Sequence, residues 1–288
     1  MQPDVACVIV FFNPAASAID TVTTLAGHPY PVVVVVNQAS SGQVAALATL
    51  DHVHVIENPC NLGLATALNQ GLGYAFDALG VRYVVTLDQD SAPDPSLPQR
   101  LVLALAEEGF GRVACIGPVL VDRKSMDGRY TYDQQSDCTK SGPRTIPTSG
   151  TLLTLEAWRD VGPMLEPLFI DGIDHEWCFR AYDKGWRVAV SRQVTMLHDM
   201  GDAGIRVFGR FKPIHRSPIR HYFIIRNTVY LCSLDYVPKK WKISECFKTL
   251  RRLAVYLLVS TDRAKSLRLM CRALRDGFSG RLGPCPIQ

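Results

Sequence analysis

The sequence contains no apolar run long enough to form a membrane-spanning helix. Its longest uncharged apolar stretches, such as Val5–Phe12 and Leu253–Val259, fall far short of the roughly 20 residues that a spanning helix needs. The amino terminus has no basic segment ahead of an apolar run, so we expect no signal peptide. Both absences favour a protein of the cytoplasm.

Cysteine pairs with metal-binding or redox spacing are also missing. The chain has nine cysteines, and none of them is arranged as C-x-x-C. The absence of this spacing argues against a zinc site and against a dithiol redox pair. An odd number of scattered cysteines favours reduced thiols, as in a cytosolic protein. Internal repeats and low-complexity segments are absent as well.

Charge is modest in amount but unevenly distributed. Charged residues make up 20% of the chain and hydrophobic residues 47%, which is typical of a folded protein. Residues 1–204 carry 13 Lys and Arg against 23 Asp and Glu, a net charge of −10, whereas residues 205–288 carry 18 against 4, a net charge of +14. An acidic body with a basic tail indicates a metal or nucleotide site in the former and an anionic surface as partner of the latter.

Strand-like and helical patterns alternate through the first 90 residues. This alternation predicts an α/β fold with a mostly parallel sheet and ligand binding at the carboxyl ends of the strands. The polar stretch 122–147 predicts an irregular loop, and a second strand–helix group follows it. The expected strands are Val5–Phe12, Pro31–Val36, Val53–Glu57, Tyr83–Leu87, Arg187–Val190 and Val194–Leu197, and the expected helices are Ala15–Ala26, Ser41–Leu50 and Leu64–Leu79.

Two aspartates, Asp88 and Asp90, follow the fourth predicted strand. Hard cations such as Mg²⁺ take oxygen ligands and bridge to phosphate oxygens, so this pair suits a metal that carries a diphosphate. Aspartate is also common in turns after strands, and the pair alone is compatible with a simple turn.

A run rich in small residues, N-L-G-L-A-T-A-L-N-Q-G, begins at Asn61. Asn61 could cap a helix, and Gly63 lets another group approach the first turn. Asn69 lies inside the predicted helix, where it requires a polar partner. A small-residue packing face explains the same run without a ligand.

A second motif, F-I-D-G-I-D-H-E-W-C-F-R, begins at Phe169 and places three carboxylates at the start of a helix. One of them could serve as a general base at the mouth of a cleft, with Arg180 as the ion-pair partner of Glu176. The helix dipole alone also favours acidic residues in a first turn. His198 follows a strand end further on, where it could be either a metal ligand or a structural residue.

Taken together and in this order, these motifs resemble the GT-A glycosyltransferases of the inverting family 2, and within it the bacterial rhamnosyltransferases that use dTDP-L-rhamnose. The resemblance covers about residues 5–235, with a fainter match at 277–283. It also includes S-G-T at 149–151 and R-N at 226–227. It implies transfer of a sugar from a nucleotide-sugar donor to a glycan or lipid-linked acceptor in surface polysaccharide synthesis.

The resemblance implies a role for each matching residue. Asp90 would hold Mg²⁺ or Mn²⁺, Asp88 would contact the ribose or the metal through water, and His198 would complete the metal site. Asp174 would deprotonate the acceptor hydroxyl. The donor site would include Phe12, Asn13, Asn37, Asn61, Gly63, Asn69, Asp88 and Gln89, and the acceptor or supporting residues would be Ser149, Gly150, Asp171, Glu176, Trp177, Arg180, Arg226 and Asn227.

Asn37 departs from the family pattern, which more usually has Asp near the base and ribose. The identity of the nucleobase is therefore open, and a UDP- or GDP-linked sugar is an alternative donor. The resemblance divides the chain into a catalytic domain, 1–235, with a nucleotide-sugar half at 1–121 and an acceptor half at 122–235, followed by a basic helical tail at 236–288.

The tail combines apolar residues at helical spacing with many cations, and Trp241 stands near its start. This pattern predicts a basic amphipathic helix that contacts an anionic membrane surface from the cytoplasm. The alternative explanation is a helix that packs on the catalytic domain or on a second subunit. We find no nucleic-acid recognition motif in the tail, so nucleic acid is not an expected partner.

Other classes fit the sequence less well. Haloacid-dehalogenase-type phosphatases carry D-x-D after their first strand, whereas here it follows the fourth. Nucleotidyltransferases of similar architecture need a basic, Gly-rich loop after the first strand, and this chain has Asn13-Pro14-Ala15-Ala16 there. A non-catalytic binding module would not need Asp90 and Asp174.

Overall fold

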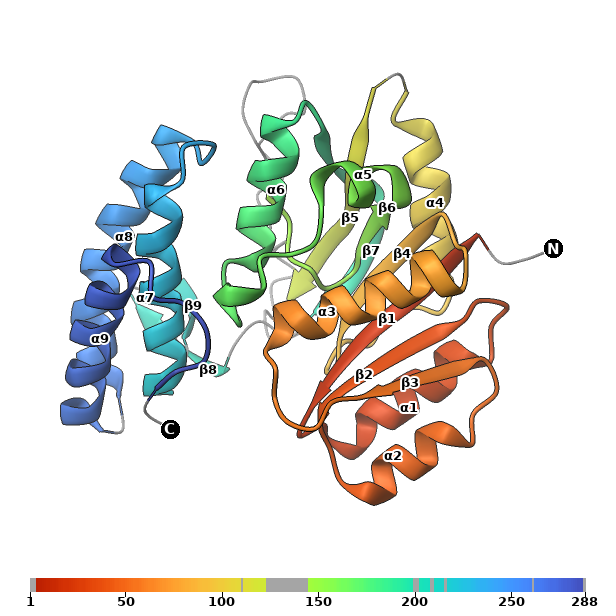
Figure 1. The fold of residues 1–288 in the computed structure, drawn as a ribbon, viewed down its shortest axis with the longest axis horizontal. Helices are drawn as coiled ribbons and strands as arrows, with labels where there is room; N and C mark the ends of the chain where they lie inside the picture. The colour runs from red at the N-terminus through yellow and green to blue at the C-terminus, as the bar shows by residue number, and fades with distance from the viewer. Residues whose placement is uncertain are drawn as a thin grey trace.

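The computed structural model describes residues 4–109, 111–122, 145–198, 202–207, 210–214, 217–260 and 262–286. Within them, seven strands form one mixed sheet in the order β3-β2-β1-β4-β6-β5-β7 (Figure 1). Strand β6 is antiparallel to its neighbours β4 and β5, and the other pairs are parallel. The predicted α/β sheet is confirmed. The strands are β1 (Val5–Phe12), β2 (Val32–Gln38), β3 (Val53–Glu57), β4 (Tyr83–Asp88), β5 (Val113–Asp122), β6 (Thr151–Thr154) and β7 (Arg187–His198).

Helices cover both faces of this sheet. In β1, Ala6, Val8 and Val10 pack into the core on one face, and Cys7 and Ile9 pack into the core on the other, because successive side chains of a strand point in opposite directions. One face is covered by α1 (Ala16–Ala26), α2 (Ser41–Ala48) and α4 (Leu97–Glu107), and the other by α3 (Leu64–Gly73), α5 (Leu155–Val161) and α6 (Ile173–Asp183).

Two element predictions differ from the structure in detail. The helix expected to reach Leu79 is α-helical to Gly73 and continues as a π-helical turn, Tyr74–Ala78. The two strands expected between 187 and 197 are one strand, β7, in which the register against β5 shifts between Val190 and Thr195, so a bulge replaces the expected break. The predicted irregular loop lies largely at 123–144, outside the described residues.

The parallel strands β1 to β4 end along one edge of the sheet. Asp88 of β4 pairs with Val10 of β1, and Phe12 pairs with Gln38 of β2. The turn that contains Asp88 and Asp90 therefore lies beside the ends of β1 and β2. This is the edge at which ligands bind in sheets of this kind.

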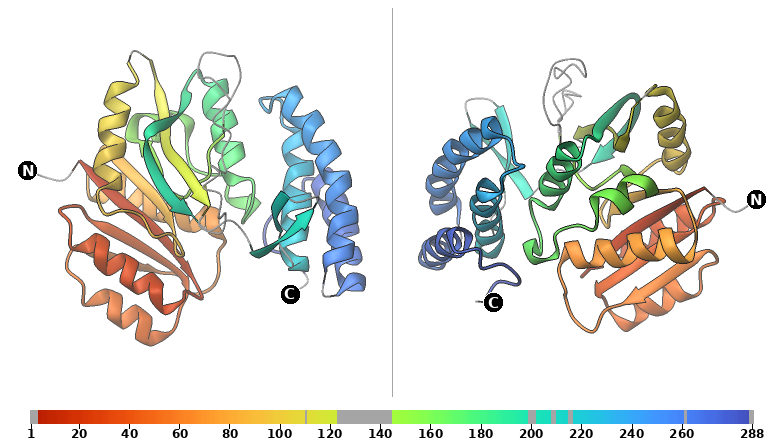
Figure 2. Two further views of the ribbon diagram at one scale, coloured as in Figure 1. Left: turned by 180° about the vertical axis from the view of Figure 1, so that it is seen from behind. Right: turned by 45° about the horizontal axis from the view of Figure 1, so that its top comes forward.

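The carboxyl-terminal part forms a helical group beside α6 and away from α1 and α2 (Figures 1 and 2). Its core contains Tyr222, Ile225, Leu269 and Met270, and the Tyr222 hydroxyl donates a 2.9 Å hydrogen bond to Asp276. None of the helices in the described part of the chain is long and apolar enough to cross a membrane. The elements here are the hairpin β8 (Asp202–Val207) and β9 (Arg210–Ile214), followed by α7 (Pro218–Ser233), α8 (Lys239–Val259) and α9 (Arg263–Phe278).

Candidate active site

The D-x-D turn is fixed to the segment that carries the S-G-T motif. The backbone N–H of Asp88 donates to Ser149 Oγ at 3.2 Å, and the hydroxyls of Ser91 and Ser149 lie 2.7 Å apart. The backbone N–H of Gly150 donates to the Thr86 carbonyl at 2.7 Å. Asp90 itself is exposed at the tip of the turn. The buried serines thus hold the backbone of the turn while the Asp90 carboxylate faces solvent.

Gln89 connects this turn to the end of β1. Its Oε1 accepts a 2.7 Å hydrogen bond from the Phe12 N–H, and its Nε2 donates to the Phe12 carbonyl at 3.1 Å. Asn13 follows in a left-handed conformation with φ of 47°, and its N–H donates to the Gln38 carbonyl. The side chain of Gln89 is therefore occupied with the backbone, and the exposed Phe12 and Asn13 lie beside the aspartates.

Asn37 holds the end of β2 against the loop before α3. Its Nδ2 donates to the Gly63 carbonyl at 3.0 Å, and its Oδ1 accepts from Asn58 at 2.8 Å. Asn58 in turn shares two hydrogen bonds with Gln70 of α3. Only 3% of Asn37 is exposed, so its hydrogen-bonding groups serve the protein in this structure.

The first turn of α3 packs directly against Phe169. The Phe169 carbonyl accepts hydrogen bonds from the N–H groups of Leu64 and Ala65 at 2.6 and 3.3 Å, which caps the helix. The residue preceding the helix is Gly63, at φ of 91°, whereas Asn61 stands two residues earlier and accepts from the Gly63 N–H. The group that approaches Gly63 is thus the loop before α6.

Asn69 has the polar partners that its position in α3 requires. Its Nδ2 donates to the Met164 carbonyl at 3.0 Å and to Glu166 at 2.9 Å, and its Oδ1 accepts from the Met164 N–H at 2.8 Å. These bonds attach α3 to the segment that leads into the loop before α6.

The loop before α6 is backbone-strained and is supported from α7. Phe169 and Asp171 both have positive φ, 67° and 66°. Asn227 Nδ2 donates to the carbonyls of Leu168, Ile170 and Asp171 at 2.7 to 3.0 Å. Such conformations persist only where the surroundings hold them, and functional sites are where they cluster.

Arg226 adds a second support from α7. It is fully buried and donates to the carbonyls of Leu168 at 2.9 Å and Gly283 at 2.5 Å. The Gly283 N–H donates to the Pro167 carbonyl at 2.7 Å. The R-N motif and the weakly matched 277–283 segment therefore position the loop that leads into α6.

Asp171 and Asp174 differ in their surroundings. Asp171 faces Arg220, whose Nε lies 3.0 Å from Oδ1 and 2.7 Å from Oδ2. Burial raises the pKa of Asp171 above its ordinary value, and the Arg220 charge opposes that rise. Asp174 is partly exposed in the first turn of α6, and its Oδ1 accepts from the His175 N–H at 2.8 Å. Asp174 is therefore partly accessible to solvent.

Glu176 serves the packing of α6. Its side chain is 1% exposed, and it accepts two hydrogen bonds from Arg180, at 2.7 and 2.9 Å, and one from the Tyr236 hydroxyl at 2.6 Å. Arg180 also donates to the Val161 and Pro163 carbonyls, and Trp177 is buried with its indole N–H on the Gly162 carbonyl. The predicted pair of Glu176 and Arg180 is present and is structural.

The possible metal ligands are only partly described. Across the described ranges, no group of three or more His, Cys, Asp or Glu side chains could hold a metal ion. His198 ends β7 opposite Asp122, but its side chain lies outside the described residues. Asp88 and Asp90 offer two carboxylates, which fits a cation such as Mg²⁺ that takes its remaining ligands from diphosphate and water.

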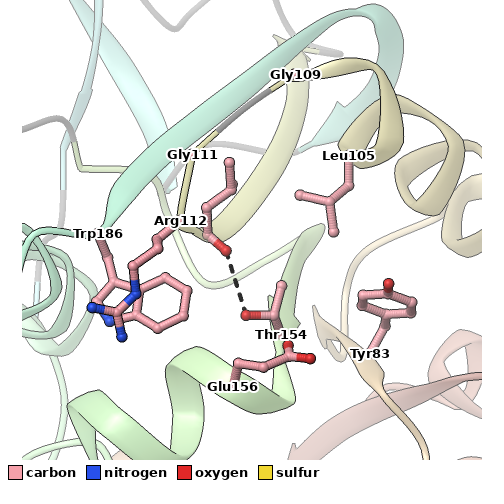
Figure 3. A pocket seen from close by; sticks show the side chains of 9 residues that line it. Tyr83, Leu105, Gly109, Gly111, Arg112, Thr154, Glu156 and Trp186 are labelled. Carbon is pink, nitrogen blue, oxygen red and sulfur yellow. Dashed lines mark hydrogen bonds between the residues drawn. The ribbon is translucent and has the colours of Figure 1, made fainter.

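The structure has a pocket of about 240 Å³, whose lining residues are drawn in Figure 3. It lies at the opposite edge of the sheet from the D-x-D turn. It includes the first residues of β4 and β5, Tyr83 and Val113, and the last residue of the antiparallel β6, Thr154. The Arg112 guanidinium lies 4.1 Å from the centre of the Trp186 ring there. Because donors bind at the carboxyl ends of parallel strands, this pocket is at the wrong edge for the donor.

Two side chains beside the site carry no sequence signal. Arg220 contacts Asp171, and Tyr236 contacts Glu176. Each lies more than 40 residues from its partner and belongs to none of the motifs. Ser91, which directly follows D-x-D, is the one neighbour that the motif itself could have indicated.

Comparison with known proteins assigns the class. The family model described as glycosyl transferase family 2 matches residues 6–154, which is more than half of the chain. The chain therefore belongs to glycosyl transferase family 2 and is a glycosyltransferase. This membership decides against the phosphatase and the non-catalytic module.

Particular relatives agree with the class. The chain is 29% identical over 300 residues to the dTDP-rhamnosyl transferase RfbF of Shigella flexneri, covering 98% of each chain. A crystal structure of S. aureus TarS residues 1–349 in complex with UDP-GlcNAc matches with a TM-score of 0.58 and 14% identity, covering 96% of this chain and 81% of that one. The same fragment in complex with UDP matches with a TM-score of 0.53 and 13% identity, covering 96% and 92%. The structural matches establish the GT-A fold.

Proposed function

We propose that this enzyme transfers L-rhamnose from dTDP-L-rhamnose to a hydroxyl of a glycan or lipid-linked acceptor in bacterial surface polysaccharide synthesis. The single observation that supports this choice of donor is the near full-length similarity to a dTDP-rhamnosyl transferase. The D-x-D turn at the carboxyl edge of the sheet supports a nucleotide-diphosphate site.

The proposed base is Asp174. The acceptor oxygen forms a bond to the anomeric carbon on the face opposite the leaving group, the bond from that carbon to the diphosphate oxygen breaks, and its electron pair leaves with the nucleoside diphosphate. Because the attack comes from the face opposite the leaving group, the configuration inverts. The acceptor proton passes to the Asp174 carboxylate. Asp174 suits this role because it is partly exposed, whereas Glu176 is buried in hydrogen bonds.

The donor prediction is tested by binding. Isothermal titration calorimetry should show dTDP-L-rhamnose or dTDP binding more tightly than UDP-glucose or GDP-mannose. Release of nucleoside diphosphate from a panel of nucleotide sugars is the matching activity assay. A clear preference for a UDP- or GDP-linked sugar would refute the rhamnose donor while leaving the glycosyltransferase class intact.

A divalent cation, Mg²⁺ or Mn²⁺, is the proposed cofactor, with Asp90 and His198 as its protein ligands and Asp88 contacting the ribose or the metal through water. When bound, it would neutralise charge on the departing diphosphate. Chelation by EDTA should abolish turnover, and added metal should restore it. Asp90→Asn should retain the fold and lose metal-stimulated turnover, whereas the control Asp20→Asn, at an exposed site on α1, should behave as wild type. Turnover that is unchanged by EDTA would contradict the metal role.

The basic tail, 236–288, is the proposed contact with the inner face of the cytoplasmic membrane. It carries 12 Lys and Arg against 3 Asp and Glu, a net charge of +9, and attraction of this kind weakens as salt screens it. Co-sedimentation of the whole chain with anionic vesicles should therefore decrease as salt rises. Because Arg226 bonds Gly283, deletion of the tail would also disturb the site, and point variants are the better test.

A further inference from the structure

One side of α8 presents a row of exposed apolar side chains. Ile243, Phe247, Leu250 and Leu258 are 59%, 70%, 66% and 72% exposed, and Ala254 lies exposed between the last two. They recur three or four residues apart, so they form one stripe along the helix. A contiguous exposed row of large apolar residues is unusual on a monomer and marks a contact surface.

The opposite side of α8 provides the packing of the helix. Glu245, Thr249 and Tyr256 are buried there, and the Tyr256 ring stacks on His221 of α7 with centroids 3.7 Å apart. At the start of the helix, Trp241 packs edge-on against Phe179 of α6 at 5.3 Å. The inner side of α8 thus makes the contacts that hold the helix in the fold. The exposed stripe has no partner among the described residues.

The charges of α8 are arranged around the stripe. Lys239, Lys240 and Arg251 are exposed, and the helical spacing places them at the borders of the stripe. The single carboxylate of α8, Glu245, is on the inner side, where it pairs with Lys248 and Arg252 at 2.7 Å each. The outward side of the helix is therefore apolar at its centre, cationic at its borders and free of negative charge.

We infer that the stripe Ile243, Phe247, Leu250 and Leu258 inserts into an anionic phospholipid surface, with α8 lying parallel to it. This inference deepens the membrane contact of the proposed function, on which it rests, by assigning the inserting side. An apolar row bordered by lysine and arginine matches the acyl boundary and the anionic headgroups together. A second copy of the chain matches less well, because two cationic borders would face each other across a twofold interface.

This orientation keeps α6, which carries the proposed base, within one helix diameter of the lipid, roughly 10–12 Å. Trp241, on the inner side of α8, lies 5.7 Å, between ring centroids, from His175, which is the residue after Asp174. This placement favours the lipid-linked form of the proposed acceptor.

The test compares vesicle binding by the full-length chain and two matched variants. Phe247→Ser/Leu250→Ser should bind phosphatidylcholine vesicles containing phosphatidylglycerol at least about tenfold more weakly than wild type, since each residue loses a large apolar side chain. The control Leu103→Ser, 66% exposed on α4, should bind as wild type. Both variants should keep wild-type melting temperatures and wild-type donor affinity in calorimetry.

A second variant tests insertion through a fluorescence change that appears on binding, so the test does not depend only on a loss of vesicle binding. Tryptophan at position 247, Phe247→Trp, should shift its fluorescence to shorter wavelength on addition of anionic vesicles and not of pure phosphatidylcholine. Equal binding by wild type and Phe247→Ser/Leu250→Ser, or no shift for Phe247→Trp, would overturn the inference. So would a wild-type dimer that these serines convert to a monomer, because the stripe would then be a subunit interface. If the wild type does not bind dTDP-L-rhamnose or dTDP, the proposed function is refuted instead.

Discussion

Replacement of Asp174 by asparagine is expected to lower kcat by about 10²–10⁴-fold, the usual contribution of a general base. A sugar hydroxyl is a poor nucleophile until its proton has an acceptor, and asparagine keeps the shape of the side chain but cannot accept that proton. Asp174 is at the first turn of α6, whereas the D-x-D turn follows β4. Donor affinity should therefore change little, and steady-state kinetics with calorimetry of dTDP binding will separate the two effects.

Three further variants make the assignment specific. Asp183→Asn, at the exposed end of the same helix, is the matched control and should retain full turnover. Glu176→Gln should lower the melting temperature, because it removes the charge that pairs with Arg180 in a buried site. If Asp174→Asn keeps near-normal kcat while Asp171→Asn abolishes turnover, the base is Asp171, and its raised pKa together with Arg220 would become the relevant chemistry.

Gly63→Ala is expected to destabilise the fold by about 3 kcal/mol or more and to reduce turnover with it. A Cβ at Gly63 would lie 2.6 Å from Phe169 Cδ2 and 2.8 Å from the Phe169 carbonyl oxygen, and the φ of 91° is itself unfavourable for alanine. Relief of the clash would displace Phe169. This residue caps α3 and stands at the start of the loop that leads to Asp171 and Asp174. Chemical denaturation and kcat measure the two consequences.

The control for this variant lies on the same helix. Gly73 has ordinary helical dihedral angles, and a Cβ there would meet nothing within 4 Å. Gly73→Ala should be neutral or stabilise by roughly 0.5–1 kcal/mol, because alanine restricts the unfolded chain more than glycine does. Equal stability of the Gly63 and Gly73 variants would show that the loop before α6 adapts without cost.

The sequence predicted those features that depend on local patterns. Short apolar, β-branched runs alternating with helical patterns predicted the sheet, and the position of Asp88 at a strand end indicated the ligand-binding edge. The role of Gly63 as a point of close approach was also apparent, although the sequence did not identify Phe169 as the approaching group. The sequence indicated Asn61 as the cap of α3, whereas the residue before the helix is Gly63 and the Phe169 carbonyl caps the first turn.

The features that the sequence did not predict depend on tertiary contacts. Helical spacing predicted the pair of Glu176 and Arg180, but the sequence did not indicate that Tyr236 also bonds Glu176 and helps to bury it. The tail illustrates a different difficulty, because its apolar residues fall on both sides of α8. Periodicity identifies the helix, but the packing of Tyr256 on His221 decides which side faces inward.

The hydrogen bonds from Arg226 to Leu168 and Gly283 also bear on synthesis of the enzyme at the ribosome. In the segment ahead of α6, the Pro167 carbonyl accepts a hydrogen bond from the Gly283 N–H and the Leu168 carbonyl accepts one from Arg226, so both partners are translated after the whole sheet. The amino-terminal sheet can form while the chain is still emerging, since domains fold progressively during synthesis. The loop before α6 can acquire its full set of bonds only after translation of residue 283, so a nascent chain that stalls earlier would hold an assembled sheet and D-x-D turn beside an unfinished loop before α6.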